Sequence, residues 1–215
     1  GFVGSNLCLE LEAKGWEVVG LDDFSTGNFA NLNGFRGDFV AADIADVGYW
    51  GPMVGKVDAI FHQAAITDTT VTDQKLMMRV NVDAFRTLVQ WAAKSKVRKL
   101  VFASSAGVYG DLPVPMREDA KPKPLNVYAF SKMVMETVAA RAKGVKCVGL
   151  RYFNVFGPRE THKDKAASMI WQLSLQMKAG RRPRVFEFGE QYRDFIYVKD
   201  VVDANLQAFE KALPG

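Results

Sequence analysis

The chain opens with Gly1-Phe-Val-Gly-Ser-Asn6 at the start of a helical pattern over residues 4–14, and this pattern leads into the apolar run Glu17-Val-Val-Gly-Leu21. Four similar runs follow, and their mostly apolar composition is typical of buried parallel strands. They lie at 38–42, 57–61, 99–103 and 146–150, with helical patterns over 46–54, 74–95 and 127–143 between them. The alternation predicts an α/β fold built on a doubly wound parallel sheet.

The composition excludes several classes of protein. Among 215 residues 48% are hydrophobic and 24% charged, with a net charge of +4, which does not fit a disordered tail, a collagen-like chain or a coiled coil. No apolar run approaches the ~18–20 residues that span a bilayer, so no membrane is expected as a partner. Two distant cysteines and two histidines predict no metal site and a cytoplasmic location. The basic clusters lack interleaved aromatic residues, so no nucleic acid is expected either.

The glycines of the opening turn predict a dinucleotide site. Gly1 and Gly4 at a helix start let the backbone approach a pyrophosphate, where free N–H groups and the helix dipole favour an anion. Asp22 ends the next strand about 20 residues further on, where a carboxylate accepts both hydroxyls of an adenosine ribose. Asp23 follows, and no Lys or Arg lies between it and Arg36. We therefore predict NAD as the cofactor, with NADP as the open alternative.

Two further strand ends have residues that suit the same ligand. At Asp43-Ile44 an acid beside an apolar residue could hold adenine, and it could equally begin the following helix. The stretch His62-Gln-Ala-Ala-Ile66 has small residues that allow close approach of a cofactor. His62 itself is expected to pack locally rather than to act in catalysis.

Three residues predict proton-transfer chemistry. Tyr128 and Lys132 are four residues apart on a helical pattern and thus share a face. Ser105 follows the strand at 99–103, at the sheet edge where open α/β sheets bind ligands. We expect Lys132 and a nicotinamide cation to lower the pKa of the phenol, the phenolate to take an alcohol proton, and Ser105 to hold the same oxygen. The simpler interpretation is a core tyrosine beside a surface lysine.

Five segments in this order resemble the extended short-chain dehydrogenase/reductase family, and within it the nucleotide-sugar epimerases. They are Gly1-Phe-Val-Gly-Ser-Asn6, the Ser105 strand end, the Tyr128/Lys132 pair, Arg151-Tyr-Phe-Asn-Val-Phe-Gly-Pro-Arg159 and Arg193-Asp-Phe-Ile-Tyr-Val-Lys-Asp200. The resemblance implies a Rossmann domain, NAD, a nucleotide-sugar substrate, and a homodimer or higher homo-oligomer. It also implies epimerisation by transient oxidation to a ketone and return of hydride to the opposite face.

Two stretches are similar to the ADP-L-glycero-D-manno-heptose 6-epimerase subgroup, whose products are lipopolysaccharide precursors. They are Thr67-Asp-Thr-Thr70, followed by Lys75-Leu-Met-Met78, and Arg159-Glu-Thr-His-Lys163. A lysine matching Lys163 serves as a second acid/base in that subgroup, whereas the residues alone also allow an exposed charge. Phe29 and Gln172 depart from the subgroup, which often has a basic residue and a histidine there. The alternatives are a UDP-hexose 4-epimerase and a non-catalytic NAD-binding protein.

The resemblance also assigns ligand contacts. Together with the opening turn, it places the cofactor against Gly1, Phe2, Val3, Gly4, Asp22, Asp23, Asp43, Ile44, Ala64, Asn81, Tyr128, Lys132 and Val155. It places the substrate against Ser105, Asn154, Lys165, Phe186 and Arg193.

Two regions are expected. Residues 1–156 form the NAD-binding domain, whose first strand, before Gly1, we expect to be missing. Residues 157–215 form a partial substrate-binding region, intertwined with a late strand and helix of that domain. Here a Gly-Pro turn and a charged stretch precede an expected helix at 166–177, strands near 184–188 and 194–198, and a final helix from about 199 to 213.

Overall fold

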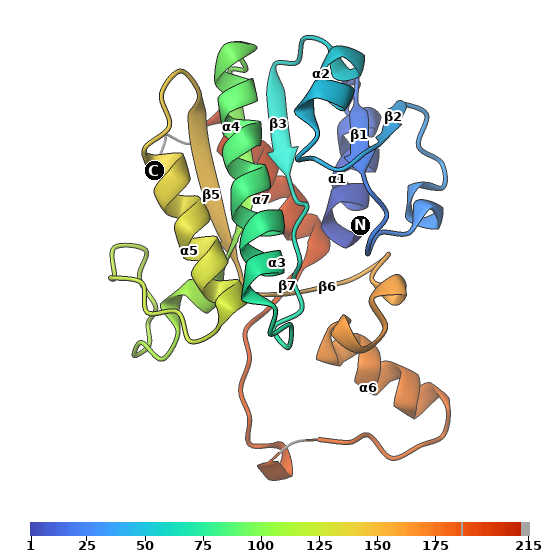
Figure 1. The fold of residues 1–215 in the computed structure, drawn as a ribbon. Coiled ribbons are helices and arrows are strands. Elements are labelled where there is room, and N and C mark those ends of the chain that lie inside the picture. Colours follow the sequence, from blue (N-terminus) through green and yellow to red (C-terminus); the bar gives the residue numbers. More distant parts are fainter. Residues whose placement is uncertain (186, 212–215) are drawn as a thin grey trace.

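The computed structural model describes residues 1–185 and 187–211, apart from the side chains of Lys165 and Glu187. The predicted substrate residue Phe186 and the side chain of Lys165 therefore lie outside the described part. Figure 1 shows a layered α/β body with the segment around α6 (Met169–Lys178) set below it.

All described strand pairs are parallel, as the βαβ pattern predicts. They are β1 (Val19–Asp22) with β2 (Asp38–Ala41); β3 (Ala59–His62), β4 (Lys99–Ser105) and β5 (Lys146–Tyr152) in that order; and β6 (Asn154–Phe156) with β7 (Phe195–Tyr197). The five strands predicted before residue 152 are confirmed, with bounds shifted by one or two residues.

Within the described residues, β1 and β3 share no strand ladder, so the sheet is interrupted between them. In a doubly wound sheet this central position belongs to the strand that precedes the glycine turn.

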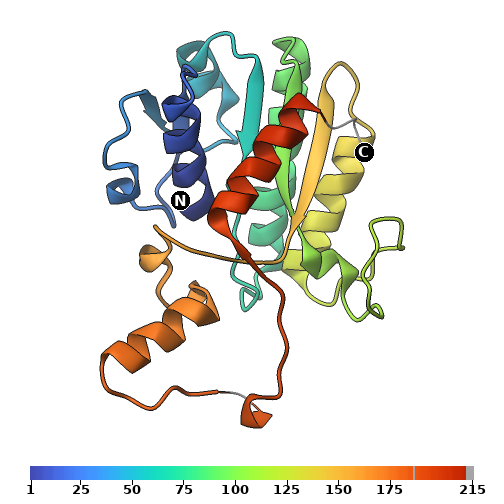
Figure 2. The same cartoon turned by 180° about the vertical axis from the view of Figure 1, so that it is seen from behind.

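Helices cover both faces of the sheet, which confirms the doubly wound architecture (Figures 1 and 2). One face carries α1 (Phe2–Ala13) and α7 (Val198–Glu210), which pack on each other. The other carries α4 (Ala84–Lys94) and α5 (Val127–Ala140), with α2 (Val47–Val54) beside α4. A short α3 (Gln74–Met78) runs through a π-turn, Arg79–Asp83, into α4. None of the described helices has the length and apolar character needed to cross a membrane.

The core consists of two layers on either side of β4, because alternate residues of a strand point to opposite faces. Leu100 and Phe102 pack with Phe85 of α4 and Met135 of α5. Val101 faces the other way, toward Phe209 of α7. All six of these side chains are at least 95% buried. The two layers hold the ends of the strands, and hence the edge that carries the candidate site, in fixed positions.

The segment from residue 157 to β7 has little buried apolar surface. It contains a 3₁₀ segment, Thr161–Ala166, and α6, which has no buried residue among those described. The predicted strand at 194–198 is confirmed as β7. The strand predicted near 184–188 is wrong for the described residues, which have no strand there and form a short 3₁₀ turn at Glu187–Gly189. Arg184, Val185 and Phe188 are exposed, so no sheet pairing fixes this run.

Candidate active site

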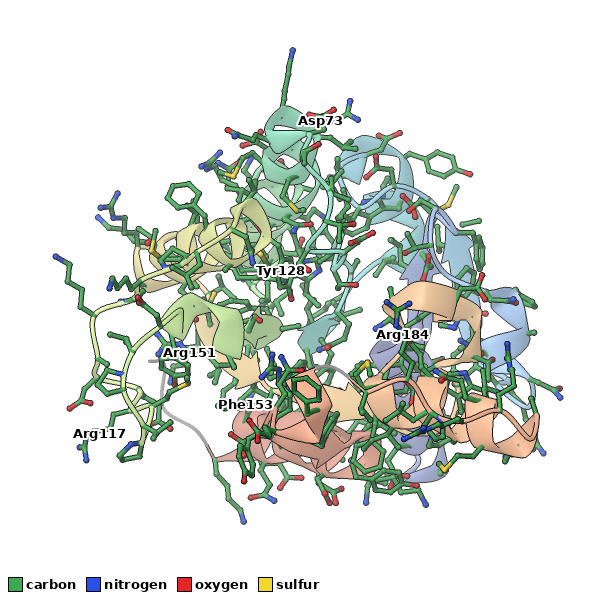
Figure 3. The ribbon with its side chains drawn as sticks, turned by 90° about the horizontal axis from the view of Figure 1, so that it is seen from below. Asp73, Arg117, Tyr128, Arg151, Phe153 and Arg184 are labelled. Carbon is green, nitrogen blue, oxygen red and sulfur yellow. The ribbon has the colours of Figure 1, made fainter. Side chains whose placement is uncertain are left out.

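The structure brings the three predicted proton-transfer residues together from two elements. β4 ends at Ser105, and α5 begins at Val127, so Tyr128 lies in the first helical turn and Lys132 one turn later. Asn126 fixes this helix start, because its side-chain oxygen accepts a hydrogen bond from Ala129 N. Figure 3 views this edge from below and shows Tyr128 near its centre.

Ser105 is oriented toward Tyr128. The Ser105 hydroxyl oxygen accepts a hydrogen bond from the backbone N–H of Gly107 at 3.1 Å. The same hydroxyl faces the phenol of Tyr128 and acts to lower its pKa. Burial acts in the opposite direction and is the larger effect, so the pKa of Tyr128 is raised overall.

Lys132 acts differently from the sequence-based expectation that it lowers the phenol pKa. Its Nζ donates to the backbone oxygen of Ala103 at 2.8 Å and lies 5.9 Å from the centroid of the Tyr128 ring. The side chain is only 2% exposed, and this burial lowers the pKa of Lys132 itself to about 7. Burial and the bond to Ser105, rather than Lys132, set the direction of the pKa shift of the phenol.

A second group of residues lies at the end of β1. Asp22 accepts hydrogen bonds from the Phe24 N–H at 2.9 Å and from the amino group of Gly1 at 2.8 Å. A Cβ on Gly27 would lie 2.8 Å from both carboxylate oxygens, so glycine is required in this loop. Asp23 is exposed and turned to its own loop, where it accepts from Ser25.

Asp43 does not cap the following helix. It accepts from the Ala45 N–H, whereas Asp46 is the residue that caps α2. The carboxylate of Asp43 therefore closes a turn at the end of β2, and Ile44 follows it with its backbone oxygen bonded to the Trp50 indole.

One cleft of about 1680 Å³ runs along this edge and continues into the interruption between β1 and β3. All predicted cofactor residues except Asn81 line it, as do Ser105, Lys163, Asn154 and Arg193. Asn81 is fully buried instead: its side chain bonds both the N–H and the C=O of Ile66 and the hydroxyl of Ser131. It thus fixes the segment after β3 against α5 and does not itself reach the cleft.

Lys163 lines the cleft from the 161–166 segment. Its Nζ lies 5.7 Å from the centroid of the Phe2 ring at the start of α1. Burial lowers the pKa of Lys163, and the nearby Glu160 carboxylate raises it by a smaller amount. Glu160 is 2% exposed and accepts hydrogen bonds from the N–H groups of Gly157 and Ser168.

The remaining predicted substrate residues are more open to solvent. Asn154 is exposed and donates to the backbone oxygen of Asp194, and Arg193 is exposed and donates to the backbone oxygen of Tyr192. His62 packs as expected: it is 4% exposed and stacks on Phe85 with ring centroids 5.3 Å apart.

The model of the NAD dependent epimerase/dehydratase family matches residues 1–215. The chain belongs to this family. An ADP-L-glycero-D-manno-heptose-6-epimerase of Brachyspira hyodysenteriae is 39% identical over 98% of the chain and 70% of its own length. The structure of the enzyme of that name from Helicobacter pylori has a TM-score of 0.93 and 44% identity, covering 100% of this chain and 71% of that one. The structure of UDP-glucose 4-epimerase from Thermotoga maritima with UDP-glucose has a TM-score of 0.91 and 31% identity, covering 99% of this chain and 71% of that one.

This epimerase/dehydratase chain is an NAD-dependent epimerase, as the sequence predicts. Its residues fit the cofactor. The first N–H groups of α1 have no partner within the helix and lie on the cleft, which suits a pyrophosphate. Asp22 lines the cleft beside that helix start, and Gly27, which has no side chain, leaves room next to its carboxylate for ribose hydroxyls.

Sequence reasoning missed one charged residue of this family member. Glu136 accepts two hydrogen bonds from Arg151, at 2.9 and 2.8 Å, and another from the hydroxyl of Ser104, the neighbour of Ser105. It thereby ties α5 to the ends of β4 and β5. A signal was present, because Glu136 follows Lys132 by four residues and so lies on the same helix face.

Proposed function

We propose that the chain is an ADP-L-glycero-D-manno-heptose 6-epimerase. The observation that carries the proposal is that one cleft holds two proton-carrying side chains on separate elements, Tyr128 of α5 and Lys163 of the 161–166 segment. Inversion at a carbinol carbon requires hydride to leave from one face and return to the other. Two acid/base groups on different walls suit both orientations of the reacting carbon. The relatives from B. hyodysenteriae and H. pylori have this name.

Each proton-transfer residue has a defined task in this proposal. NAD, when bound, supplies the hydride acceptor for oxidation of the carbinol to a ketone and the hydride donor for its reduction. Tyr128 takes the proton of the reacting hydroxyl, and Ser105, held by Gly107, donates a hydrogen bond to the same oxygen. Lys132 fixes the start of α5 against β4 through Ala103 and provides a nearby ammonium group in its protonated form.

Lys163 serves as the second acid/base. General bases work best with a pKa near the operating pH, and burial moves the pKa of Lys163 in that direction. Its position in the cleft, on an element separate from α5, allows it to exchange a proton with the substrate oxygen after the ketone has rotated to present its other face to the cofactor.

The substrate is proposed to bind against the wall of the cleft that the paired 154–155 and 193–195 segments form together. Arg193 offers a fork of N–H donors to the pyrophosphate of a nucleotide-sugar, since charge-assisted bonds to phosphate oxygens are strong. Asn154 lies on the same wall and offers an amide for a sugar hydroxyl. Lys165 and Phe186 keep their proposed roles from the family resemblance alone.

A UDP-hexose 4-epimerase is the second candidate. The T. maritima enzyme supports it through a TM-score of 0.91, and Ser105, Tyr128 and Lys132 would serve that reaction equally. Gln172 lies at the position where the heptose subgroup often has a histidine. Its side chain donates a hydrogen bond to the backbone oxygen of Ala167 and so stabilises the start of α6.

A substrate panel separates the candidates. The full-length enzyme is assayed with ADP-D-glycero-D-manno-heptose, UDP-glucose and UDP-N-acetylglucosamine, and C6″ and C4″ epimers are resolved by NMR. Turnover of the ADP-heptose at least tenfold faster than of either UDP-sugar is the expected result. Preference for a UDP-sugar would overturn the heptose assignment and leave the epimerase chemistry intact.

We also propose that the enzyme acts as a homodimer or higher homo-oligomer in the cytoplasm. Phe130 of α5 is 45% exposed on an outer helix face, which suits contact with a second copy. Cys8 and Cys147 are both free thiols, as is usual in a reducing compartment. Sedimentation equilibrium of the full-length protein, compared with a Phe130→Ser variant, tests the assembly; an unchanged monomeric mass in both would refute it.

A further inference from the structure

Three segments that are distant in the sequence meet beside Lys163. The Arg159 guanidinium donates to the backbone oxygen of Asn31 at 3.0 Å and to the side-chain oxygen of Asn6 at 3.2 Å. In return, the Asn31 amide donates to the backbone oxygen of Arg159 at 3.0 Å, and the Asn6 amide donates to the backbone oxygen of Pro158 at 3.1 Å. We call these three residues the Arg159 clamp.

The clamp residues form part of the structure behind the site. Asn6 and Asn31 are 8% and 9% exposed, and none of the three lines the cleft. Asn31 Nδ2 also lies 2.9 Å from Nδ1 of His162, the residue directly before Lys163. The same Nδ1 lies 3.0 Å from the backbone oxygen of Arg159, so the imidazole of His162 contacts two of the groups that the clamp joins. Burial is the largest effect on the pKa of His162 and lowers it.

The backbone at Arg159 has a conformation that needs support. Its φ of 75° lies in the left-handed region, which costs a non-glycine residue roughly 1 kcal/mol or more. The clamp bonds the carbonyl and the side chain of this one residue. Four residues later, Lys163 N–H is bonded to the Glu160 backbone oxygen, so the fixed turn continues directly into the segment that carries Lys163.

We infer that Arg159 is a positioning residue that, through Asn31 and Asn6, holds Lys163 on the wall of the cleft. The inference rests on the proposed role of Lys163 as second acid/base. It also links the two ligand subsites: Asn31 belongs to the 3₁₀ turn Phe29–Leu32 that follows the Asp22 loop, and Asn6 belongs to α1, whose start faces the cofactor. Arg159 itself touches neither ligand subsite and is not a catalytic residue.

A double-mutant cycle in the full-length enzyme tests this inference. Turnover of the ADP-heptose is measured for wild type, Arg159→Ala, Lys163→Ala and the double variant. Displacement of a catalytic group by about 1 Å costs on the order of 10- to 100-fold, so Arg159→Ala should lower kcat by that factor with little change in KM. In the Lys163→Ala background the same substitution should change kcat less than about twofold, since the group it positions is gone. Arg117→Ala, at an exposed ion pair, is the matched control.

Two further variants separate positioning from folding. Asn31→Ala breaks the clamp from its other side and should reproduce the Arg159→Ala phenotype, whereas Arg159→Lys keeps a charged donor and should recover part of the rate. Formation of reduced nicotinamide in a single turnover depends on Tyr128 and should be unchanged in each variant, as should cooperative thermal unfolding.

The outcomes are distinguishable. If Lys163→Ala loses less than twofold, the second acid/base role fails, and the inference fails with it. If Lys163→Ala is strongly impaired and Arg159→Ala multiplies that loss independently, the proposed function stands and the clamp inference is overturned. Loss of single-turnover nicotinamide reduction in Arg159→Ala would likewise overturn it, because the effect would then not act through Lys163.

Discussion

Replacing Lys132 by methionine should make the protein more stable while abolishing its activity. Lys132 is 2% exposed, and burial lowers its pKa from 10.5 to about 7. A shift of this size corresponds to about 5 kcal/mol against folding when the lysine is protonated in both states. Methionine has a similar length and no charge, so this cost disappears.

The lost hydrogen bond offsets part of this gain. Lys132 Nζ donates to Ala103 O at 2.8 Å, and leaving that oxygen without a partner costs about 1–3 kcal/mol. We therefore expect a net stabilisation of about 2–4 kcal/mol near pH 6. Above the folded-state pKa the unfolded lysine still binds a proton that the folded one does not, so the stability of the wild type rises with pH. From about pH 6 to about pH 9 the advantage of the variant should shrink by about 3 kcal/mol.

Urea unfolding of both proteins at these two pH values measures the difference between their free energies of unfolding. The contributions of the other titrating groups cancel in this difference. Equal differences at the two pH values, or a variant less stable than the wild type near pH 6, would refute a buried lysine of lowered pKa. Lys132→Arg is the informative control, because arginine stays charged and should be strongly destabilising at both pH values.

Three other substitutions test separate parts of the site. Tyr128→Phe should lower kcat by at least about 100-fold, within the range of a lost general base, while NAD still binds with unchanged affinity in a fluorescence titration; retained turnover would contradict the assignment. Gly27→Ala places a Cβ 2.8 Å from both Asp22 oxygens and should weaken NAD binding by about tenfold or more. The wild type should bind NAD more tightly than NADP, and tighter binding of NADP in calorimetry would be inconsistent with the ribose contact of Asp22. His62→Phe should make the folded protein more resistant to acid. Burial holds the pKa of His62 near 3 in the folded state, so between about pH 6.5 and 3 the imidazole is protonated only in the unfolded state. The free energy of unfolding of the wild type therefore falls as the pH falls through this range, and that of the variant lacks this contribution. If the acid unfolding midpoints of wild type and variant coincide, His62 does not titrate in this way.

The sequence predicted the architecture well because apolar periodicity controls it. Leu100, Val101 and Phe102 alternate between two core layers, so an apolar run of this kind has few alternatives to a buried strand. The run near 184–188 has no such constraint, because its described residues neither pair with another strand nor pack into a core. Local propensity alone therefore gave the wrong result there.

The site was predicted only in part, since motifs identify residue types and not their neighbours. Ser105, Tyr128 and Lys132 meet as predicted, because a strand end and a helix start are rigid positions. The electrostatics were not accessible in the same way: the direction of the Tyr128 pKa shift depends on burial, and the role of Asn81 depends on a contact with Ile66. The Arg159 clamp joins positions more than 120 residues apart, which no local pattern reveals.

The residues proposed for hydride chemistry and those proposed to contact the sugar-nucleotide lie on different kinds of structural support. Tyr128, Lys132 and Glu136 occupy successive turns of one helix, braced on the core, whereas Asn154 and Arg193 are exposed on extended segments. Mutations in those segments can accumulate without disturbing the helix. A scaffold of this kind can change the sugar it accepts during evolution while its hydride chemistry is inherited unaltered.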